Sequence, residues 1–227
     1  MTVYIEKPAF NLREELASLR NQGGYQEQQF YFDGLVTNGT FDADLTGWTL
    51  DAGYSNTVVS SQLVCDRNGD TDGNGLYQSF STVVGKTYTA TVDIVSLADG
   101  GRARIMIGTS AYSLDLGGAA SITPAGTYSY TFVALATTTY ISLGVDFDSA
   151  GIVTYDNVSV FEVDANDDVI HTMPKGWKPK DVFEDGLLQR EGAANDYEVV
   201  YDGFDYVVKP TVAPSATTQT CVIGVKA

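Results

Sequence analysis

Strict alternation of apolar and polar residues is the feature that most constrains the fold of this chain. Residues 88–94 place Tyr, Ala, Val and Ile at every second position, and residues 128–132 repeat the pattern with two tyrosines and a phenylalanine. Because successive side chains of a strand point to opposite faces, this period of two predicts strands with one buried face. Further candidate strands, separated by glycine-rich or aspartate-rich turns, predict a β-sandwich: residues 35–36, 48–50, 57–64, 76–82, 103–107, 112–116, 140–147 and 153–163.

The composition agrees with a folded β protein. Of the 227 residues, 44% are hydrophobic and 19% are charged, which is typical of a globular chain that can bury a core. The net charge of −16 argues against nucleic acid and anionic membranes, because their phosphates require a surface of lysine and arginine. An acidic surface is, however, compatible with bound calcium, with high-salt surroundings, or with solubility at high local concentration.

The sequence also predicts where the protein is made. No stretch approaches the roughly 18 apolar residues of a membrane span. The N-terminus lacks the basic and then apolar pattern of a signal peptide, so we expect synthesis in a cytoplasm. Cys65 and Cys221 are far apart, and we expect two buried thiols rather than a disulfide.

Residues 1–33 are predicted to form a docking segment with a short helix. Asn11 and Glu14 have the spacing of a capping box, and Leu12, Leu16 and Leu19 then recur on one face of a helix. A helix of about ten residues is marginal on its own, so this leucine stripe must pack on something. It could pack against the protein's own sandwich, against its copies, or against a larger assembly.

Three motifs carry a family resemblance. Residues 35–42 read Leu-Val-Thr-Asn-Gly-Thr-Phe-Asp and are followed by Gly47-Trp48; residues 76–80 and 85–88 come next, and residues 154–160 close with Thr-Tyr-Asp-Asn-Val-Ser-Val. Their order and separation resemble the jelly-roll carbohydrate-binding modules that are attached to glycoside hydrolases. The resemblance implies a jelly-roll β-sandwich over residues 34–164, with Trp48 in its core.

Calcium is the cofactor that the sequence predicts, at two places. The family resemblance implies a structural calcium shared by Asp42 and Asp156, although this chain has Asp42 where the family usually has glutamate. Separately, Asp66, Asp70 and Asp72 alternate like the start of an EF-hand loop, but the required glycine and final glutamate are missing. That segment is either an irregular calcium loop or a solvated turn.

The C-terminal part is predicted to be a separate unit. Residues 165–181, rich in aspartate, proline and lysine, are expected to be a linker. Residues 182–227 begin with a hairpin turning at Asp-Gly, and they resemble a small β module that recurs in phage tail and fibre proteins. They depart from that module by a longer insert at residues 193–195 and by Lys209-Pro210. Residues 4–17 also resemble short N-terminal segments of tailed-phage virion proteins.

Enzymatic chemistry is poorly supported. The single histidine, His171, lies in the expected linker, so catalytic triads and histidine-ligated zinc sites lack their parts. No phosphate-binding glycine motif is present, and no pair of carboxylates stands out for glycoside cleavage.

Sugar binding requires aromatic rings flanked by polar hydrogen-bonding groups. The candidates are Tyr54, Tyr77, Gln78, Arg102, Arg104, Tyr112 and Tyr140.

The sequence thus predicts a mainly β, non-enzymatic structural protein of a tailed-phage virion, either a head decoration or a tail-fibre component. It would be made in the host cytoplasm, form a homo-oligomer, bind other virion subunits and display its sandwich outward. Two alternatives stay open. One is a receptor-binding module for host-surface polysaccharide, and the other is a stand-alone carbohydrate-binding accessory of an enzyme complex.

Overall fold

A computed structural model describes residues 27–32, 34–51, 55–67, 75–166, 168–215 and 218–226. This part of the chain consists of strands, turns and loops, which confirms the mainly β prediction. The predicted helix and its leucines, Leu12, Leu16 and Leu19, lie outside the described residues. Within the described ranges no helix is long and apolar enough to cross a membrane.

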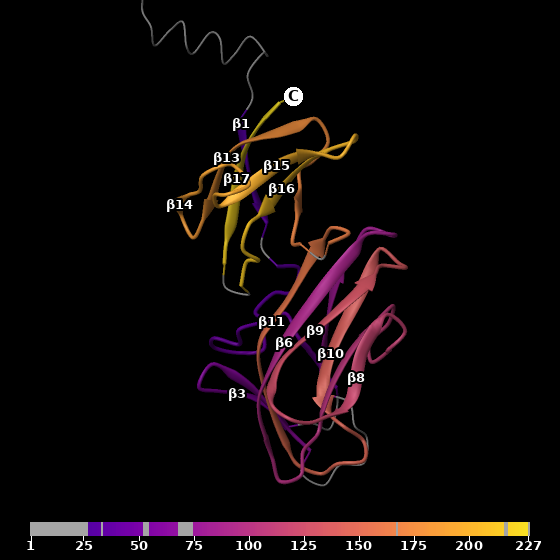
Figure 1. Cartoon of the computed structure of the whole chain (residues 1–227). Coiled ribbons are helices and arrows are strands. Elements are labelled where there is room, and N and C mark those ends of the chain that lie inside the picture. Colours follow the sequence, from indigo (N-terminus) through magenta and orange to yellow (C-terminus); the bar gives the residue numbers. More distant parts are fainter. Residues whose placement is uncertain are drawn as a thin grey trace, which may run out of the picture.

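Two five-stranded antiparallel sheets form a sandwich (Figure 1). One sheet has the order β2 (Thr49–Leu50), β5 (Leu76–Ser81), β10 (Thr138–Val145), β7 (Ala103–Gly108) and β8 (Gly117–Ile122). The other has the order β3 (Ser55–Val59), β4 (Gln62–Asp66), β11 (Ile152–Val163), β6 (Thr87–Ala98) and β9 (Gly126–Val133).

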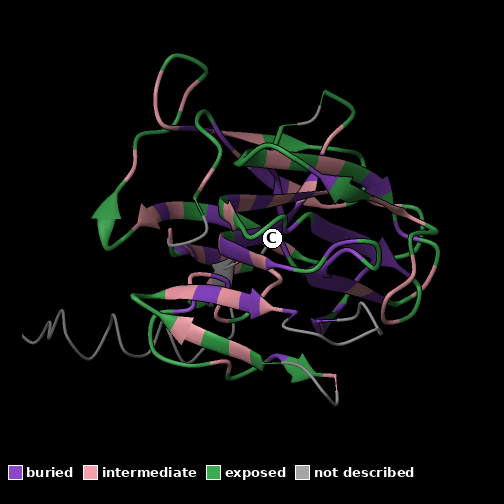
Figure 2. Ribbon diagram, turned by 90° about the horizontal axis from the view of Figure 1, so that it is seen from below, coloured by how far each residue is buried: buried purple, intermediate pink, exposed green. Residues whose placement is uncertain are grey.

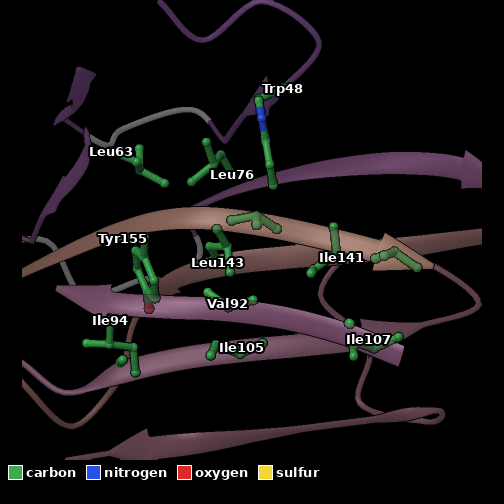
Figure 3. Close-up of a cluster of buried hydrophobic side chains, with 14 of the residues drawn as sticks. Trp48, Leu63, Leu76, Val92, Ile94, Ile105, Ile107, Ile141, Leu143 and Tyr155 are labelled. Carbon is green, nitrogen blue, oxygen red and sulfur yellow. The ribbon is translucent and has the colours of Figure 1, made fainter. Parts of the chain in front are cut away.

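The inward-facing residues of both sheets meet in one core. Alternate positions of β5, β6, β7 and β10 are buried there, and Figure 3 shows them packed beneath Trp48. Trp48 is 7% exposed, as predicted for the core. Tyr155 of β11 spans the core, where its hydroxyl lies 2.6 Å from the Gly144 carbonyl oxygen and accepts the Arg104 N–H at 3.0 Å. This side chain therefore links the two sheets by hydrogen bonds as well as by packing.

Two smaller antiparallel sheets form a second unit, which we call the end module. One has the order β1 (Glu27–Phe32), β17 (Thr220–Lys226), β13 (Trp177–Glu184) and β14 (Leu187–Leu188); the other has β12 (His171–Thr172), β16 (Tyr206–Pro210) and β15 (Tyr197–Tyr201). Met173, Val182, Tyr197, Val208 and Val222 form its core. Figure 2 shows the buried residues between the layers and the exposed ones along the loops.

Two predictions about the segments on either side of the sandwich, residues 27–32 and 165–181, are wrong. The expected linker over residues 165–181 contains β12 and the beginning of β13. Its proline and lysine content suggested a linker, but Ile170 and Met173 are buried, and Pro179 is accommodated at a register shift of β13. Residues 27–32, expected to belong to the docking segment, form strand β1. Phe30 explains this, because its ring packs against the module core and lies 5.1 Å from Trp177.

The two paired strands β1 and β17 of the end module lie on either side of the whole sandwich in the sequence. Glu27 pairs with Val225 and Phe32 pairs with Thr220, in antiparallel register. The chain therefore enters and leaves the end module side by side. In Figure 1 the beginning of β1 and the C-terminus lie together at the end farthest from the sandwich.

The junction between the units is held by ion pairs and by burial. Lys209 of β16 lies 2.6 Å from Asp164 and 3.2 Å from Asp168, which follow the last sandwich strand. His171 is 3% exposed, and this burial lowers its pKa from 6.5 to about 4. The imidazole is therefore neutral in the folded protein at pH 7.

This burial predicts a pH-dependent stability. His171 takes up a proton at a higher pH in the unfolded chain than in the folded chain. The free energy of unfolding is therefore highest above pH 6.5 and decreases as the pH falls towards 4. The free energy of unfolding should fall by about 3 kcal/mol from this group. Urea unfolding at several pH values would measure it. A His171→Gln variant should lack this part of the pH dependence, and an unchanged slope would contradict the assignment.

Candidate functional site

The outward face of the sheet β2-β5-β10-β7-β8 carries the candidate site. Alternation along β5 buries Leu76 and Phe80 and turns Tyr77 outward, and β10 likewise turns out Tyr140 and Ser142. Tyr77 pairs with Ser142 across the two strands. The register therefore brings the two tyrosines to one face, although 62 positions of the sequence separate them.

A loop adds a third tyrosine to this face. Tyr112 lies between β7 and β8, and its N–H donates to the Ser142 hydroxyl at 3.0 Å. The Tyr112 ring meets Tyr77 edge to face, with centroids 5.5 Å apart and planes at 83°, and Tyr140 lies 6.0 Å from Tyr77. We call Tyr77, Tyr112 and Tyr140 the tyrosine cluster. Each of its members is partly exposed.

Asp115 fixes the loop that carries Tyr112. Its carboxylate accepts the N–H and the hydroxyl of Thr109 at 3.0 and 2.6 Å and the hydroxyl of Ser113 at 2.5 Å. These hydrogen bonds, that of Ser113 first, lower the Asp115 pKa to about 2. The loop packs so closely on β7 that a Cβ added at Gly108 would lie 2.4 Å from the Asp115 carboxylate. The strand predicted over residues 112–116 is therefore a turn, with β8 beginning at Gly117.

Arg104 occupies the same face of β7, two positions from Met106. Its guanidinium lies 3.7 Å from the centroid of the Phe147 ring, which is 46% exposed. The loop that carries Phe147 is held from inside by Arg67, which donates to the carbonyl oxygens of residues 146, 147 and 149. Phe147 and Asp115 were not among the predicted site residues although both lie in predicted strands, because their contacts with Arg104 and with the Tyr112 loop depend on the tertiary structure.

The other predicted sugar-binding residues do not join this cluster. Gln78 points inward, where its amide bonds the Thr37 N–H at 2.6 Å and the Thr37 carbonyl at 2.9 Å. Alternation could have shown this, because Gln78 lies between the buried Leu76 and Phe80. Arg102 is exposed at the start of β7, and Tyr54 lies outside the described residues.

Two of the predicted calcium residues, Asp66 and Asp156, lie on the other sheet, and Asp42 lies in the loop before β2. Desolvation and then repulsion from Asp93 and Asp42 raise the pKa of Asp156, so these carboxylates are near one another. Among the residues that the structure describes, no three acidic, histidine or cysteine side chains gather closely enough to hold a metal ion. Asp66 ends β4, and its predicted partners Asp70 and Asp72 lie outside the described residues.

A separate cavity of about 380 Å³ lies at the junction of the two units. Its apolar lining includes Val163, Ile170, Val200 and Val207. The lysines at its edge are paired, Lys86 with Glu162 at 3.1 Å and Lys209 with Asp164. We do not assign a ligand to it.

No protein-family model and no curated protein sequence matches this chain. Solved structures similar to it include a carbohydrate-binding module of the CBM4 group (18% identity, 56% of this chain, 99% of that chain, TM-score 0.47). A second is the structure of the CBM22-1 and GH10 modules of Clostridium thermocellum xylanase 10B (14% identity, 59% of this chain, 29% of that chain, TM-score 0.44). A third is the enzymatically active domain of bacteriophage CBA120 tailspike protein 4 (13% identity, 57% of this chain, 21% of that chain, TM-score 0.41). At these identities and TM-scores, the likenesses establish no shared ligand or activity.

Proposed function

We propose that the sandwich is a non-catalytic carbohydrate-binding domain whose ligand contacts the tyrosine cluster. The observation that carries the proposal is the convergence of Tyr77, Tyr112 and Tyr140 on one partly exposed sheet face. Aromatic rings offer apolar faces to the C–H groups of a pyranose, while the exposed Ser79, which pairs with Tyr140, provides a hydroxyl group nearby.

The angle between the rings bears on the kind of carbohydrate. Tyr112 stands almost perpendicular to Tyr77, so the two rings form adjacent walls and not a flat plate. A flat crystalline polysaccharide requires coplanar rings, whereas a single soluble chain can place its sugars in the corner between two walls. The proposed ligand is therefore a soluble polysaccharide chain, such as a host-surface glycan.

The test is affinity electrophoresis against a panel of soluble plant and bacterial polysaccharides. Tyr77→Ala and Tyr140→Ala should each weaken binding about tenfold, because each removes a stacking surface. Thr89→Ala is the matched control, since Thr89 lies on the outward face of the opposite sheet, hydrogen-bonded to Thr131. Failure of the parent protein to bind any polysaccharide, or an equal loss of affinity in all three variants, would contradict the proposal.

We further propose that the protein is displayed on a tailed-phage virion, with the sandwich outward. The arrangement of the units supports this, because the beginning of β1 and the end of β17 lie on the side of the end module away from the sandwich. An attachment through either end then leaves the tyrosine cluster accessible. The resemblances of residues 4–17 and 182–227 to phage proteins motivate the choice of a virion.

Immunogold labelling of purified particles, with antibody against residues 34–163, tests the location. Gold over heads would indicate a decoration protein, and gold over tails or fibres would indicate host attachment. Unlabelled particles, with the antibody shown to recognise the folded protein, would leave a free carbohydrate-binding module as the better explanation.

A structural calcium held by Asp42 and Asp156 stays a proposal of its own. Desolvation, followed by repulsion from Asp93 and Asp42, raises the Asp156 pKa, and a bound divalent cation would favour the charged carboxylate, with main-chain oxygens completing its ligands. Millimolar calcium should then raise the Tm by a few degrees, and Asp156→Asn should remove the response. An equal calcium response in Asp156→Asn and the parent would contradict it, as would no response in the parent.

A further inference from the structure

Strand β9 is the longest edge strand among the residues that the structure describes. It ends the sheet β3-β4-β11-β6-β9, and its eight residues pair with β6 without a register shift. None of the eight is charged, and none is proline. Edge strands present a row of N–H and C=O groups to any passing strand, and they are ordinarily protected by short length, charges, proline or bulges. β9 has none of these protections.

The other edge strands in the described part of the chain are protected. β2, β12 and β14 have two residues each, and β3 has five. β8 pairs with β7 through a register shift. β1 carries Glu27, which is ion-paired with Lys180, and β15 carries Glu198. The contrast favours a pairing partner for the free edge of β9.

Charge is also absent from the sequence around β9. Residues 116–145 contain no charged side chain, although the whole chain has 29 acidic residues and a net charge of −16. Both β8 and β9 lie in this stretch, and they border the same side of the sandwich (Figure 1). Charges elsewhere on the surface are screened beyond about 8 Å at physiological ionic strength. Two copies can therefore approach at this side without bringing like charges together.

The backbone groups of alternate β9 residues point to the free edge. Ala134, which follows β9 directly, donates its N–H to the Lys86 carbonyl at 3.0 Å, so its backbone groups point towards β6. Successive residues of a strand turn their backbone groups to opposite sides. Thr127, Ser129 and Thr131 therefore direct their N–H and C=O groups away from β6, to the edge.

We propose that two copies of this chain pair through β9 in antiparallel orientation, with Ser129 opposite the partner's Ser129. In this register Thr127 lies opposite the partner's Thr131. Each such pair exchanges two backbone hydrogen bonds, which gives about six across the edge. The two five-stranded sheets then form one continuous sheet.

The outward side chains match in this register. The Thr131 hydroxyl lies 3.0 Å from that of Thr89 on β6. The Ser129 hydroxyl lies 3.2 Å from that of Thr91. Self-pairing extends both rows of hydroxyl groups across the edge, because Ser129 meets its own copy and Thr131 meets the partner's Thr127. Cross-strand pairs of threonine and serine stabilise antiparallel sheets.

The inward side chains match as well. Tyr128 and Tyr130 are partly exposed and pack at the margin of the sandwich core. The proposed register places Tyr128 opposite the partner's Tyr130, in a pair without backbone hydrogen bonds, where side chains approach most closely. A second copy supplies both the hydroxyl rows and the tyrosines, so it is favoured over an unrelated extended segment.

The pairing has a consequence for the tyrosine cluster. The cluster lies on the outward face of the opposite sheet, which the pairing of β9 leaves uncovered. The two-fold axis is perpendicular to the joined sheet, so both clusters face the same side of the dimer. One polysaccharide chain can then bind at two places, which raises its avidity. This consequence rests on the proposed carbohydrate function, whereas the dimer does not.

Sedimentation velocity of the full-length chain, without carbohydrate, tests the dimer. The parent should sediment with twice the mass of one chain and should dissociate on dilution. Ser129→Lys sets two like charges opposite each other at the axis, so the dimer dissociation constant should rise about tenfold or more. Thr57→Lys is the matched control, because Thr57 is exposed on β3 at the other edge of the same sheet. Its dissociation constant should equal that of the parent.

Cross-linking tests the register independently. Directly opposite residues of a hydrogen-bonded pair have Cα atoms about 5.5 Å apart, a distance that a disulfide spans. Mild oxidation should therefore link two copies of Ser129→Cys about tenfold faster than two copies of Thr57→Cys. The native Cys65 is 2% exposed, and Cys221 is present in both variants, so the comparison isolates the new thiol.

The outcomes are distinct. Loss of the dimer in Ser129→Lys but not in Thr57→Lys, with far-ultraviolet circular dichroism unchanged in both, supports the proposal. A parent that is monomeric throughout, a dimer that survives Ser129→Lys, or equal linkage of the two cysteine variants would each overturn it. Because no carbohydrate is present, failure of the glycan-binding experiment leaves these results unaffected.

Discussion

Burial of alternate side chains between two antiparallel sheets is the constraint on which the rest of this structure depends. Once Leu76, Ile141 and Leu143 are committed to the core, Tyr77 and Tyr140 must face outward on neighbouring strands. A slip of one residue in either strand would exchange the two sets, at the cost of the buried apolar area. The candidate carbohydrate site is therefore a consequence of core packing, because no separate interaction is needed to turn its two strand tyrosines to one face.

The third tyrosine depends on a different kind of interaction. Tyr112 lies in a loop and has a positive φ of 62°. Such a conformation persists only where its surroundings hold it, and the Asp115 hydrogen bonds and the Ser142 hydroxyl do so. The site thus combines a rigid sheet with one loop fixed by short polar contacts, which keeps the three rings in a defined arrangement before any ligand arrives.

Pairing of the first described strand with the last determines the layout of the molecule. β1 supplies Phe30 to the end module, so that module requires residues from both sides of the sandwich. The two ends then emerge together, and the sandwich extends from the opposite side (Figure 1).

The sequence by itself determined the secondary-structure class and the sandwich, because period-two alternation and turn residues are local signals. The core position of Trp48 followed from the resemblance to carbohydrate-binding modules. The sequence also named Tyr77, Tyr112, Tyr140 and Arg104, though without showing that they share a face. Only the tertiary structure decided that Gln78 points inward, that the expected linker contains strands, and that β1 pairs with β17. Those outcomes depend on register and on contacts between residues far apart in the chain, and neither composition nor local periodicity specifies which distant strand will be the neighbour.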